Sequence, residues 1–368
     1  MSTPAVRFAD LRLGADGPAV RAAIERVLER GWYVLGPEVR AFEEAFARAS
    51  GAPHAVGVGC GTDAITLLLR AAGVGRGDEV IVPALTSPFT ALAVLAAGAV
   101  PVFADIDPRR LTLDPAACAA AIGPRTRAVV PVHLYGQPAD VPALARLASA
   151  RGLALVEDCC QAHLATCGGV PVGTTGAGGA FSFYPTKNLG ALGDGGAVVT
   201  PDGEVAQTVR ELRDGGRASR DQHVRAGMNS RLDELQAAVL DARLPALHRA
   251  TARRRGIAQL YRSLIAPSSR VVVPPALDAG HVYHLFPVLC DDRDGLARAL
   301  TAAGVETLPH YPISLPDQPA FADATATPCP VARAAAARVL SLPIGPALTD
   351  DEVRRVAAAV NALSGGVA

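Results

Sequence analysis

Residues 128–158, AVVPVHLYGQPADVPALARLASARGLALVED, hold two apolar runs on either side of an alanine-rich stretch with helical spacing. The apolar runs are Ala128–His133 and Leu153–Glu157, and Val141–Ala150 lies between them. Continuous apolar strands that are separated by a helix are typical of a parallel sheet covered on both faces. This stretch therefore predicts an α/β fold.

The same alternation extends over residues 50–200 and predicts a whole sheet. Helical patterns at Thr62–Ala72 and Pro88–Ala97 also separate apolar runs. The expected strands are Ala55–Gly59, Glu79–Pro83, Pro101–Ala104, Ala128–His133, Leu153–Glu157, Ala180–Tyr184 and Gly196–Thr200. We therefore expect a mostly parallel, seven-stranded sheet flanked by helices.

Helical patterns flank this region, and a second, smaller unit follows it. Amphipathic patterns predict helices at Ala19–Arg30, Glu38–Ala49, Arg231–Leu247 and Ala252–Leu264. From about residue 271 the chain offers one clear strand, His284–Cys290, and two helices, Arg293–Ala303 and Asp350–Leu363. We expect a large domain of residues 1–248 and a smaller C-terminal α+β domain of residues 249–368.

Composition restricts the classes of partner. The 368 residues carry 35 basic and 35 acidic side chains, so neither a basic surface for nucleic acid nor an acidic tail is indicated. The N-terminus lacks a charged start followed by an apolar run, and no apolar run reaches the roughly 18 residues of a membrane span. These features predict a cytoplasmic protein with no nucleic-acid or membrane partner.

The seven cysteines predict neither a disulfide framework nor a metal site. Their number is odd, no two form a C-x-x-C motif, and no His/Cys cluster has the spacing of a zinc site. We expect the adjacent Cys159 and Cys160 to be small, reduced core residues, and we expect no bound metal.

Lys187 is the only lysine in the chain. A lysine amine can form a covalent imine with an aldehyde once burial or nearby charge lowers its pKa, whereas a guanidinium cannot. A coding bias that replaced lysine by arginine would also leave a single lysine by chance. The residues around Lys187 decide between these interpretations.

Two further groups in the expected sheet suit a phosphorylated ring. Asp158 follows the strand Leu153–Glu157, where a carboxylate can hold a protonated pyridine nitrogen; it could equally cap a following helix. Gly61 and Thr62 begin a helix, and a glycine turn at a helix N-terminus can bind an anion, although Gly-Thr is also simply a good helix start.

Ser182 completes this set, because it precedes Lys187 by five residues and a turn could bring its hydroxyl to the same phosphate. The glycine-rich stretch 189–196 would let the backbone pass close to a flat cofactor. An anion cradle, a carboxylate and a single amine are together what pyridoxal 5′-phosphate (PLP) requires.

Four stretches resemble, in the family's order, the DegT/DnrJ/EryC1/StrS family of PLP-dependent sugar aminotransferases. They are Pro131–Gln137 (PVHLYGQ), Val156–His163 (VEDCCQAH), Phe181–Gly196 and Asn229–Ala238 (NSRLDELQAA). The resemblance runs from Leu35 to Gly345, nearly the whole chain. It implies the fold of fold-type I PLP transferases, which are similar to aspartate aminotransferase.

The resemblance also implies roles for the ring-binding residues. Lys187 would bind the cofactor covalently and move the substrate proton. Asp158 would hold the pyridine nitrogen, and Gln161 would contact the ring face or its phenolic oxygen.

The phosphate is implied to lie against Gly61, Thr62 and Ser182. Asn229 would reach the phosphate of the neighbouring subunit, because active sites of this family form at a dimer interface. A homodimer with shared active sites follows from the resemblance alone.

Four residues match positions that line the substrate pocket in relatives. Tyr33, His310 and Tyr311 would contact the sugar, although a tyrosine between two helices is more often a packing residue. Arg231 could clamp the carboxylate of the amino donor, or it could form an ordinary ion pair.

Two positions depart from the family pattern. The family often has an aromatic residue that stacks on the ring at position 87, where this chain has Ser87 followed by Pro88 and Phe89. Phe89 could take over the stacking, or the ring could rest on something smaller. The family commonly has glycine where this chain has Leu164, whose side chain could narrow the substrate pocket.

The implied activity is transamination in aminosugar and antibiotic biosynthesis. Glutamate or glutamine would donate an amino group, which then passes to a keto group of a nucleotide-linked keto-deoxysugar. Pro131–Gln137 is slightly more similar to enzymes that act at C3 than to those that act at C4.

Other activities remain open on the same sequence. An aminotransferase that acts on a cyclitol (an inosose) would use the same residues. A PLP-dependent sugar dehydratase is less consistent, because related enzymes that dehydrate at C3 have histidine in place of Lys187. A non-catalytic protein of this fold would not need the complete residue set, and no strand opens the G-x-G-x-x-G motif of a nicotinamide enzyme.

Overall fold

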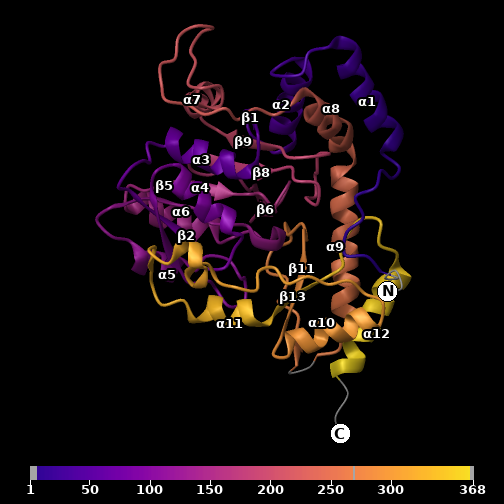
Figure 1. Cartoon of the computed structure of the whole chain (residues 1–368). Coiled ribbons are helices and arrows are strands. Elements are labelled where there is room, and N and C mark those ends of the chain that lie inside the picture. Colours follow the sequence, from indigo (N-terminus) through magenta and orange to yellow (C-terminus); the bar gives the residue numbers. More distant parts are fainter. Residues whose placement is uncertain (1–5, 268–269, 365–368) are drawn as a thin grey trace.

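A large sheet is the centre of the structure, a computed structural model that describes residues 6–267 and 270–364 (Figure 1). Its eight strands lie in the order β1, β9, β8, β5, β4, β2, β3, β12. Their bounds are β1 His54–Val58, β2 Glu79–Pro83, β3 Val100–Ala104, β4 Thr126–Val129, β5 Ala154–Asp158, β8 Gly178–Ser182, β9 Gly196–Thr200 and β12 Thr325–Ala326.

Strand directions confirm a mostly parallel sheet. The strands from β8 through β12 run parallel to their neighbours, and only β9 runs antiparallel to β1 and β8. The expectation of seven strands is wrong by one, because β12 pairs with the edge strand β3. A two-residue strand from the C-terminal part of the chain leaves no apolar run that a sequence pattern could identify.

Helices cover both faces of the sheet, as expected. Successive residues of a strand point to opposite faces, so Val80 and Val82 pack on one side and Ile81 on the other. One face packs against α3 (Gly61–Ala71), α4 (Pro88–Ala96) and α7 (Gly203–Arg213). The other packs against α2 (Pro37–Ala49), α5 (Pro115–Ala121) and α6 (Val141–Ala150).

Aspartates begin several helices by accepting backbone N–H groups of the first turn. Asp114, Asp140 and Asp202 do so at α5, α6 and α7. An oxygen side chain at this position satisfies donors that have no partner within the helix. Helix α7, which the apolar pattern did not predict, therefore has a recognisable N-terminal capping residue in Asp202.

The C-terminal part has its own sheet and helices. Strands β10 (Val271–Val272), β11 (Phe286–Cys290) and β13 (Val339–Leu342) are antiparallel. Helices α10 (Arg293–Ala302) and α12 (Asp350–Ser364) accompany them, and α11 (Pro330–Arg338) precedes β13. The start of the chain joins this part, because the Val6 amide donates to the Gly304 carbonyl at 2.9 Å and Val6 packs in its core.

A long helix joins the two parts of the molecule. In Figure 1, α9 (Leu247–Leu264) runs from α8 (Glu234–Arg243) down to α12. The predicted helix 231–247 is interrupted by a 3₁₀ turn, Leu244–Ala246, where Pro245 has no amide hydrogen to donate. The division of the chain near residue 248 stays a prediction.

The remaining elements are one helix, a short hairpin and several 3₁₀ turns. Helix α1 (Gly17–Arg30) packs against α8, and β6 (Thr166–Cys167) forms a short hairpin with β7 (Val170–Pro171). Further 3₁₀ turns are Leu134–Gly136, Leu315–Asp317 and Pro319–Phe321. Within residues 6–267 and 270–364, no helix is both long and apolar enough to cross a membrane.

Candidate active site

The carboxyl edge of the large sheet brings the predicted lysine and carboxylate together. Asp158 is the last residue of β5 and Ser182 the last residue of β8, and these two strands are parallel neighbours. Lys187 lies in the turn that follows β8, close enough to Asp158 for their charges to interact. Parallel strands present their carboxyl ends at one edge, where ligands of such sheets bind.

The Lys187 amine is set apart from other polar groups. The side chain is half-buried, and its backbone N–H donates to the Tyr184 carbonyl at 2.8 Å. Burial lowers the pKa of Lys187, and the negative charge of nearby Asp158 acts in the opposite direction. No hydrogen bond to the amine exists among the described residues, so the nitrogen is available for covalent chemistry.

The predicted phosphate site is a close contact between α3 and β8. A Cβ atom on Gly61 would lie 2.6 Å from Cys160 Sγ and 2.7 Å from Ser182 Cβ, so only glycine fits there. This contact places Ser182 beside the first turn of α3, where Thr62 is the second residue. Helix-terminal N–H groups and a hydroxyl are donors that suit a phosphate, so the site fits this part of PLP.

Two hydrogen bonds fix the Asp158 carboxylate. The Thr90 hydroxyl donates to Oδ2 at 2.8 Å, and the Cys160 backbone N–H donates to Oδ1 at 3.0 Å. Asp158 is only 4% exposed. The alternative that it caps a following helix fails, because β5 leads into turns and the hairpin β6–β7. A buried carboxylate beside an amine fits the ring nitrogen of PLP.

Gln161 is held at both ends of its amide. Its Oε1 accepts the Tyr135 backbone N–H at 2.7 Å, and its Nε2 donates to the Tyr311 hydroxyl at 3.1 Å. Tyr135 has a φ of +61°, a conformation that few non-glycine residues adopt. The structure therefore brings two predicted residues, Gln161 and Tyr311, into direct contact, and a strained residue that the sequence did not single out holds the other end of the Gln161 amide.

His310 and Tyr311 reach the site from the C-terminal part of the chain. His310 stacks on Phe8 with 5.5 Å between ring centroids, and its Nδ1 lies 3.1 Å from Ser341 Oγ. Burial lowers the pKa of His310 to about 4, and the charge of Lys187 acts in the same direction. Near neutral pH the imidazole is therefore uncharged.

Three other predicted residues lie apart from this group within one chain. Tyr33 is exposed between α1 and α2, and Asn229 is exposed next to Ser230. Arg231 Nη1 lies 2.6 Å from Asp214 Oδ1, the ordinary ion pair that the sequence left open. No hydrogen bond between described residues joins these side chains to Lys187, so their roles stay predictions.

Of the two expectations for the ring face near position 87, the structure bears only on Phe89. Phe89 is 60% exposed on α4, so within one chain it is not the stacking residue. Burial raises the pKa of Tyr311, while hydrogen bonds with Ser87 and Gln161 act in the opposite direction. Tyr311 is thus the aromatic residue that Ser87 contacts.

Leu164 has a left-handed backbone and lines a cavity. Its φ is +60°, and its side chain lines a 130 Å³ cavity together with Ala49, Pro171 and His248. None of the residues around Lys187 lines this cavity. Leu164 thus lines a cavity apart from Lys187, and its effect on the substrate pocket stays a prediction. The left-handed backbone turns the side chain toward α2.

His163 is a site residue that the sequence did not single out. It is fully buried beside Phe181 and Phe183, and its Nε2 lies 2.9 Å from the Ser182 carbonyl oxygen. Burial lowers its pKa to about 3, and Lys187 contributes in the same direction. A neutral imidazole that donates to Ser182 holds the end of β8. Its position in the QAH run was the available signal.

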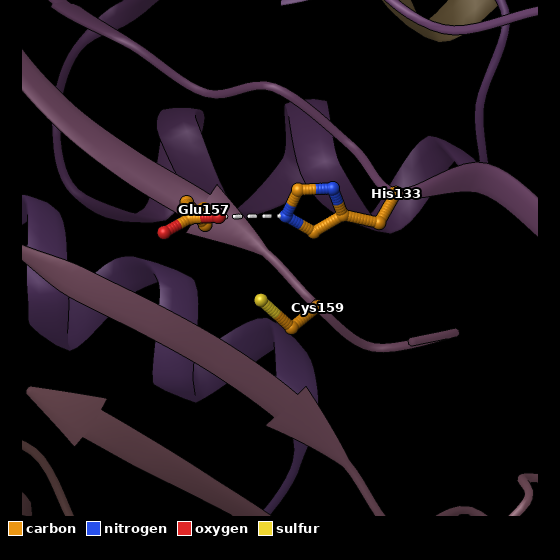
Figure 2. Close-up of side chains that lie close together, drawn as sticks. All are labelled: His133, Glu157 and Cys159. Atoms are coloured by element: carbon orange, nitrogen blue, oxygen red, sulfur yellow. Dashed lines mark hydrogen bonds and ion pairs between the residues drawn. The ribbon is translucent and has the colours of Figure 1, made fainter. Parts of the chain in front are cut away.

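His133, Glu157 and Cys159 bring three possible metal ligands within 4.8 Å of one another (Figure 2). His133 Nε2 lies 2.9 Å from Glu157 Oε2, and His133 Nδ1 accepts the Ala139 N–H at 3.0 Å. Both ring nitrogens are therefore already bonded. We interpret the cluster as a buried hydrogen-bond network that fixes the end of β5.

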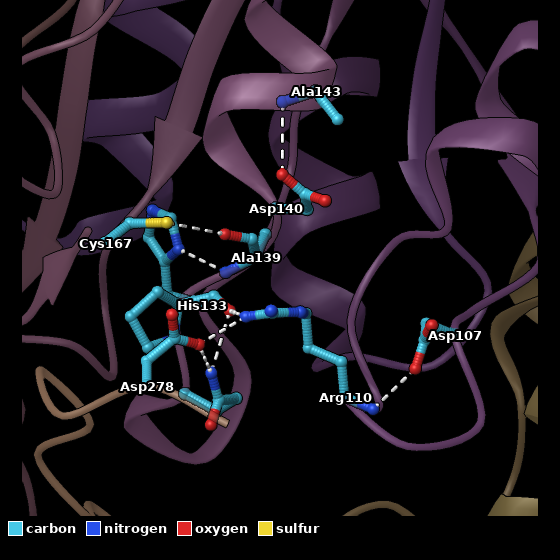
Figure 3. Close-up of polar contacts among 10 residues, drawn as sticks. Asp107, Arg110, His133, Ala139, Asp140, Ala143, Cys167 and Asp278 are labelled. Atoms are coloured by element: carbon cyan, nitrogen blue, oxygen red, sulfur yellow. Dashed lines mark hydrogen bonds and ion pairs between the residues drawn. The ribbon is translucent and has the colours of Figure 1, made fainter. Parts of the chain in front are cut away.

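A second network of polar contacts lies around Arg110 and Asp278 (Figure 3). Asp278 Oδ2 accepts hydrogen bonds from Arg110 and from Gln137. Arg110 also donates to the Pro138 carbonyl at 2.9 Å. These bonds tie the loop 134–138 to the chain around residue 278, so the Tyr135 N–H that binds Gln161 has a firm support.

Comparisons with known proteins agree with this geometry. The model of the DegT/DnrJ/EryC1/StrS aminotransferase family matches residues 16–361. The chain is 49% identical over 360 residues to a Saccharopolyspora erythraea protein named erythromycin biosynthesis sensory transduction protein EryC1, covering 97% of this chain and 98% of that protein. It is 48% identical over 364 residues to dTDP-3-amino-3,4,6-trideoxy-alpha-D-glucose transaminase of Streptomyces venezuelae, covering 97% and 96%.

A solved structure gives the same result for the fold. DesV of S. venezuelae, crystallised in complex with a ketimine intermediate, superposes with a TM-score of 0.96 at 47% identity. The match covers 100% of both chains. The fold-type I architecture expected from the sequence is thereby confirmed.

Proposed function

Because this chain belongs to the DegT/DnrJ/EryC1/StrS aminotransferase family, and is thus a PLP-dependent aminotransferase, we propose that its acceptor is a nucleotide-linked keto-deoxysugar. The amino donor is glutamate or glutamine, and the keto group lies at C3 rather than C4. The observation that carries the transamination chemistry is the only lysine amine of the chain beside Asp158 at the carboxyl edge of the sheet, and the acceptor is inferred from similarity.

The residues of the site divide the work of binding PLP. Gly61, Thr62 and Ser182 hold the phosphate, and Asp158 keeps the ring nitrogen protonated. Gln161 contacts the ring from the position that Tyr135 and Tyr311 fix. Bound PLP supplies an electron sink that makes the proton on the amino-bearing carbon acidic.

Lys187 performs the proton transfers. Its Nζ, whose pKa burial lowers, takes the proton from the amino-bearing carbon of the donor and later returns one to the former keto carbon of the sugar. His163 and His310 are neutral near pH 7 because burial lowers the pKa of each. They therefore add no competing positive charge next to the amine.

The choice of C3 rests on similarity and not on geometry. The S. venezuelae relative carries the name of a transaminase for a dTDP-3-amino sugar, at 48% identity over nearly the full length of both chains. A dTDP-linked 3-keto-deoxysugar is therefore the first acceptor to assay. Its 4-keto isomer and an inosose are the matched alternatives.

We also propose a homodimer with shared active sites. Phe89, Leu92 and Leu95 lie three residues apart on α4, and all three are exposed. This spacing puts them on one face of the helix, and a contiguous exposed apolar face is typical of an interaction surface. Asn229, exposed in one chain, would then be free to contact the neighbouring site. The molar mass in solution, measured by light scattering, tests the dimer.

The experiment that tests the activity is an absorbance spectrum of the purified protein with PLP, before and after excess L-glutamate. We expect a band near the border of the visible and ultraviolet ranges to fade while a band at shorter wavelength grows. The protein in this second form is then mixed with each acceptor, and recovery of the first band identifies the substrate.

The outcomes separate the candidate functions. Recovery of the first absorbance band with the 3-keto sugar alone supports the proposal. Recovery with the 4-keto sugar or with the inosose would instead identify that compound as the acceptor. A first band that neither glutamate nor glutamine changes would contradict transamination from these donors and would favour a dehydratase or a non-catalytic role.

A further inference from the structure

Thr90 contacts Asp158 across 68 positions of the chain. Its hydroxyl donates to Asp158 Oδ2 at 2.8 Å. Thr90 is the third residue of α4, and Pro88 is the first. Because proline fixes the start of the helix, the sequence Ser87-Pro88-Phe89-Thr90 sets which face of α4 carries the hydroxyl toward the end of β5.

The Thr90 hydroxyl bonds to a group outside its own helix. Threonine hydroxyls in a helix commonly donate back to the carbonyl four residues earlier, as Thr66 does to the Thr62 carbonyl at 3.0 Å. Thr90 donates instead to a side chain on another element. Thr90 lies in the first turn of α4, and the residue four positions earlier, Thr86, precedes the helix, so this hydroxyl can bond outside its own helix.

The contact is protected from water. Thr90 is 1% exposed and Asp158 is 4% exposed. A hydrogen bond to a charged group is stronger than one between neutral groups, and it strengthens further in a medium of low polarity. The Cys160 thiol also interacts with the Asp158 carboxylate, and Thr90 is the donor whose hydroxyl binds Oδ2 at 2.8 Å.

Two donors define the plane of the carboxylate. Thr90 approaches Oδ2, and the backbone N–H of Cys160 approaches Oδ1 at 3.0 Å. A carboxylate offers about four acceptor positions, so roughly two remain for a ligand. With both oxygens bonded, the group cannot rotate without losing a bond, and the remaining positions keep one direction.

We propose that Thr90 is a positioning residue that holds the Asp158 carboxylate in the orientation that binds the ring nitrogen of PLP. This inference rests on the cofactor role proposed for Asp158, and it does not depend on which amino donor or sugar the enzyme uses. Thr90 acts only through Asp158 and touches neither cofactor nor substrate.

The test measures cofactor binding by the full-length protein. Protein freed of cofactor is titrated with PLP and, separately, with an analogue that has carbon in place of the ring nitrogen. T90V removes the hydroxyl at nearly constant shape, and T90S retains it. The loss of a hydrogen bond to a charged group predicts that T90V raises the Kd for PLP about tenfold. T90S should stay within about threefold of the unchanged protein.

The analogue and a second background distinguish positioning from a structural role. For the ring-carbon analogue, T90V and the unchanged protein should bind equally. In a D158N background, T90V should add no further loss. An equal loss with the analogue, or the same tenfold loss on top of D158N, would overturn the proposal.

Two controls keep these results interpretable. Circular dichroism and the thermal midpoint establish that each variant is folded. T90A, which also lacks the hydroxyl, takes the place of T90V if T90V does not fold. PLP binding requires no donor or acceptor, so a failed glutamate reaction would contradict the proposed function and leave the conclusion about Thr90 intact.

Discussion

Gln161 Nε2 donates to the Tyr311 hydroxyl at 3.1 Å, and this bond joins the large sheet to the C-terminal part of the chain. Gln161 follows β5, whereas Tyr311 comes from a segment anchored by His310 to Ser341 and Phe8. The amide that should face the ring is therefore oriented by both parts of the molecule.

Replacement of Tyr311 by phenylalanine should slow the reaction without unfolding the protein. Y311F leaves Gln161 Nε2 without its acceptor, and the cost of one neutral hydrogen bond predicts a loss of about fivefold in the rate of the glutamate half-reaction. Stopped-flow absorbance measures this rate. The matched control is Y261F, whose hydroxyl donates to the Pro343 carbonyl at 2.8 Å in the C-terminal core. Y261F should lower stability by about 1 kcal/mol and leave the rate unchanged.

Removal of the Lys187 amine should abolish turnover. K187A and K187R both lack the primary amine, while K187R keeps the positive charge, so both should lower the half-reaction rate by at least about 10³-fold. Rapid-mixing absorbance with L-glutamate measures the rate, and circular dichroism establishes folding. Substantial turnover by K187R would show that positive charge, and not the primary amine, is what the site requires.

Acidification should destabilise the folded chain through its buried histidines. Burial lowers the pKa of His163 in the folded state to about 3, below the value of about 6.5 expected when unfolded. Below pH 6.5 the unfolded state therefore binds more protons, and the free energy of unfolding falls as pH drops toward 3. Each such histidine contributes about 1 kcal/mol per pH unit in this window.

The variant H163Q isolates this effect, because glutamine can still donate to the Ser182 carbonyl but does not titrate. Urea unfolding at pH 7 and pH 5 should show that H163Q loses roughly 1–2 kcal/mol less than the unchanged protein. H248Q, at an exposed histidine, should behave as the unchanged protein does. Equal losses in all three proteins would mean that His163 takes up its proton without unfolding.

At position 164 a glycine variant should be more stable than an alanine variant, the reverse of the usual order of stability. Both L164G and L164A remove the apolar side chain, but only glycine adopts a φ of +60° without strain. We expect L164G to be more stable than L164A by about 1 kcal/mol in urea unfolding. The half-reaction rate should be the same for both, because Leu164 lines a cavity that contains none of the residues around Lys187. A lower half-reaction rate in L164A than in L164G would indicate that the side chain at position 164 contacts the substrate pocket.

The sequence predicted the parts of the fold that follow from local patterns. Apolar runs located the seven longer strands of the sheet, because buried parallel strands are hydrophobic on both faces. Lys187 and Asp158 were identifiable because their positions after strands place them at one edge. Pairing of β12 with β3, by contrast, depends on a contact between residues more than 200 positions apart.

The contacts that orient the site residues could not be predicted from the sequence for the same reason. Thr90 in the sequence is an ordinary helical threonine, and only the packing of α4 beside β5 brings its hydroxyl to Asp158. Tyr135 has a positive φ, which could not be predicted from its residue type. The direction of the Leu164 side chain was equally unpredictable, because it depends on that same backbone angle.

Because Lys187 is half-buried and is the only lysine, proteolysis at this residue can measure local unfolding of the chain. A protease that cuts only after lysine can divide it at a single peptide bond, into residues 1–187 and 188–368. Because that bond lies in the turn after β8, digestion requires the turn to leave the sheet edge, and the cleavage rate follows the population of that opened state. Loss of the full-length band, as fragments of about half its length appear, would thus measure local unfolding at this edge of the sheet, with no label introduced.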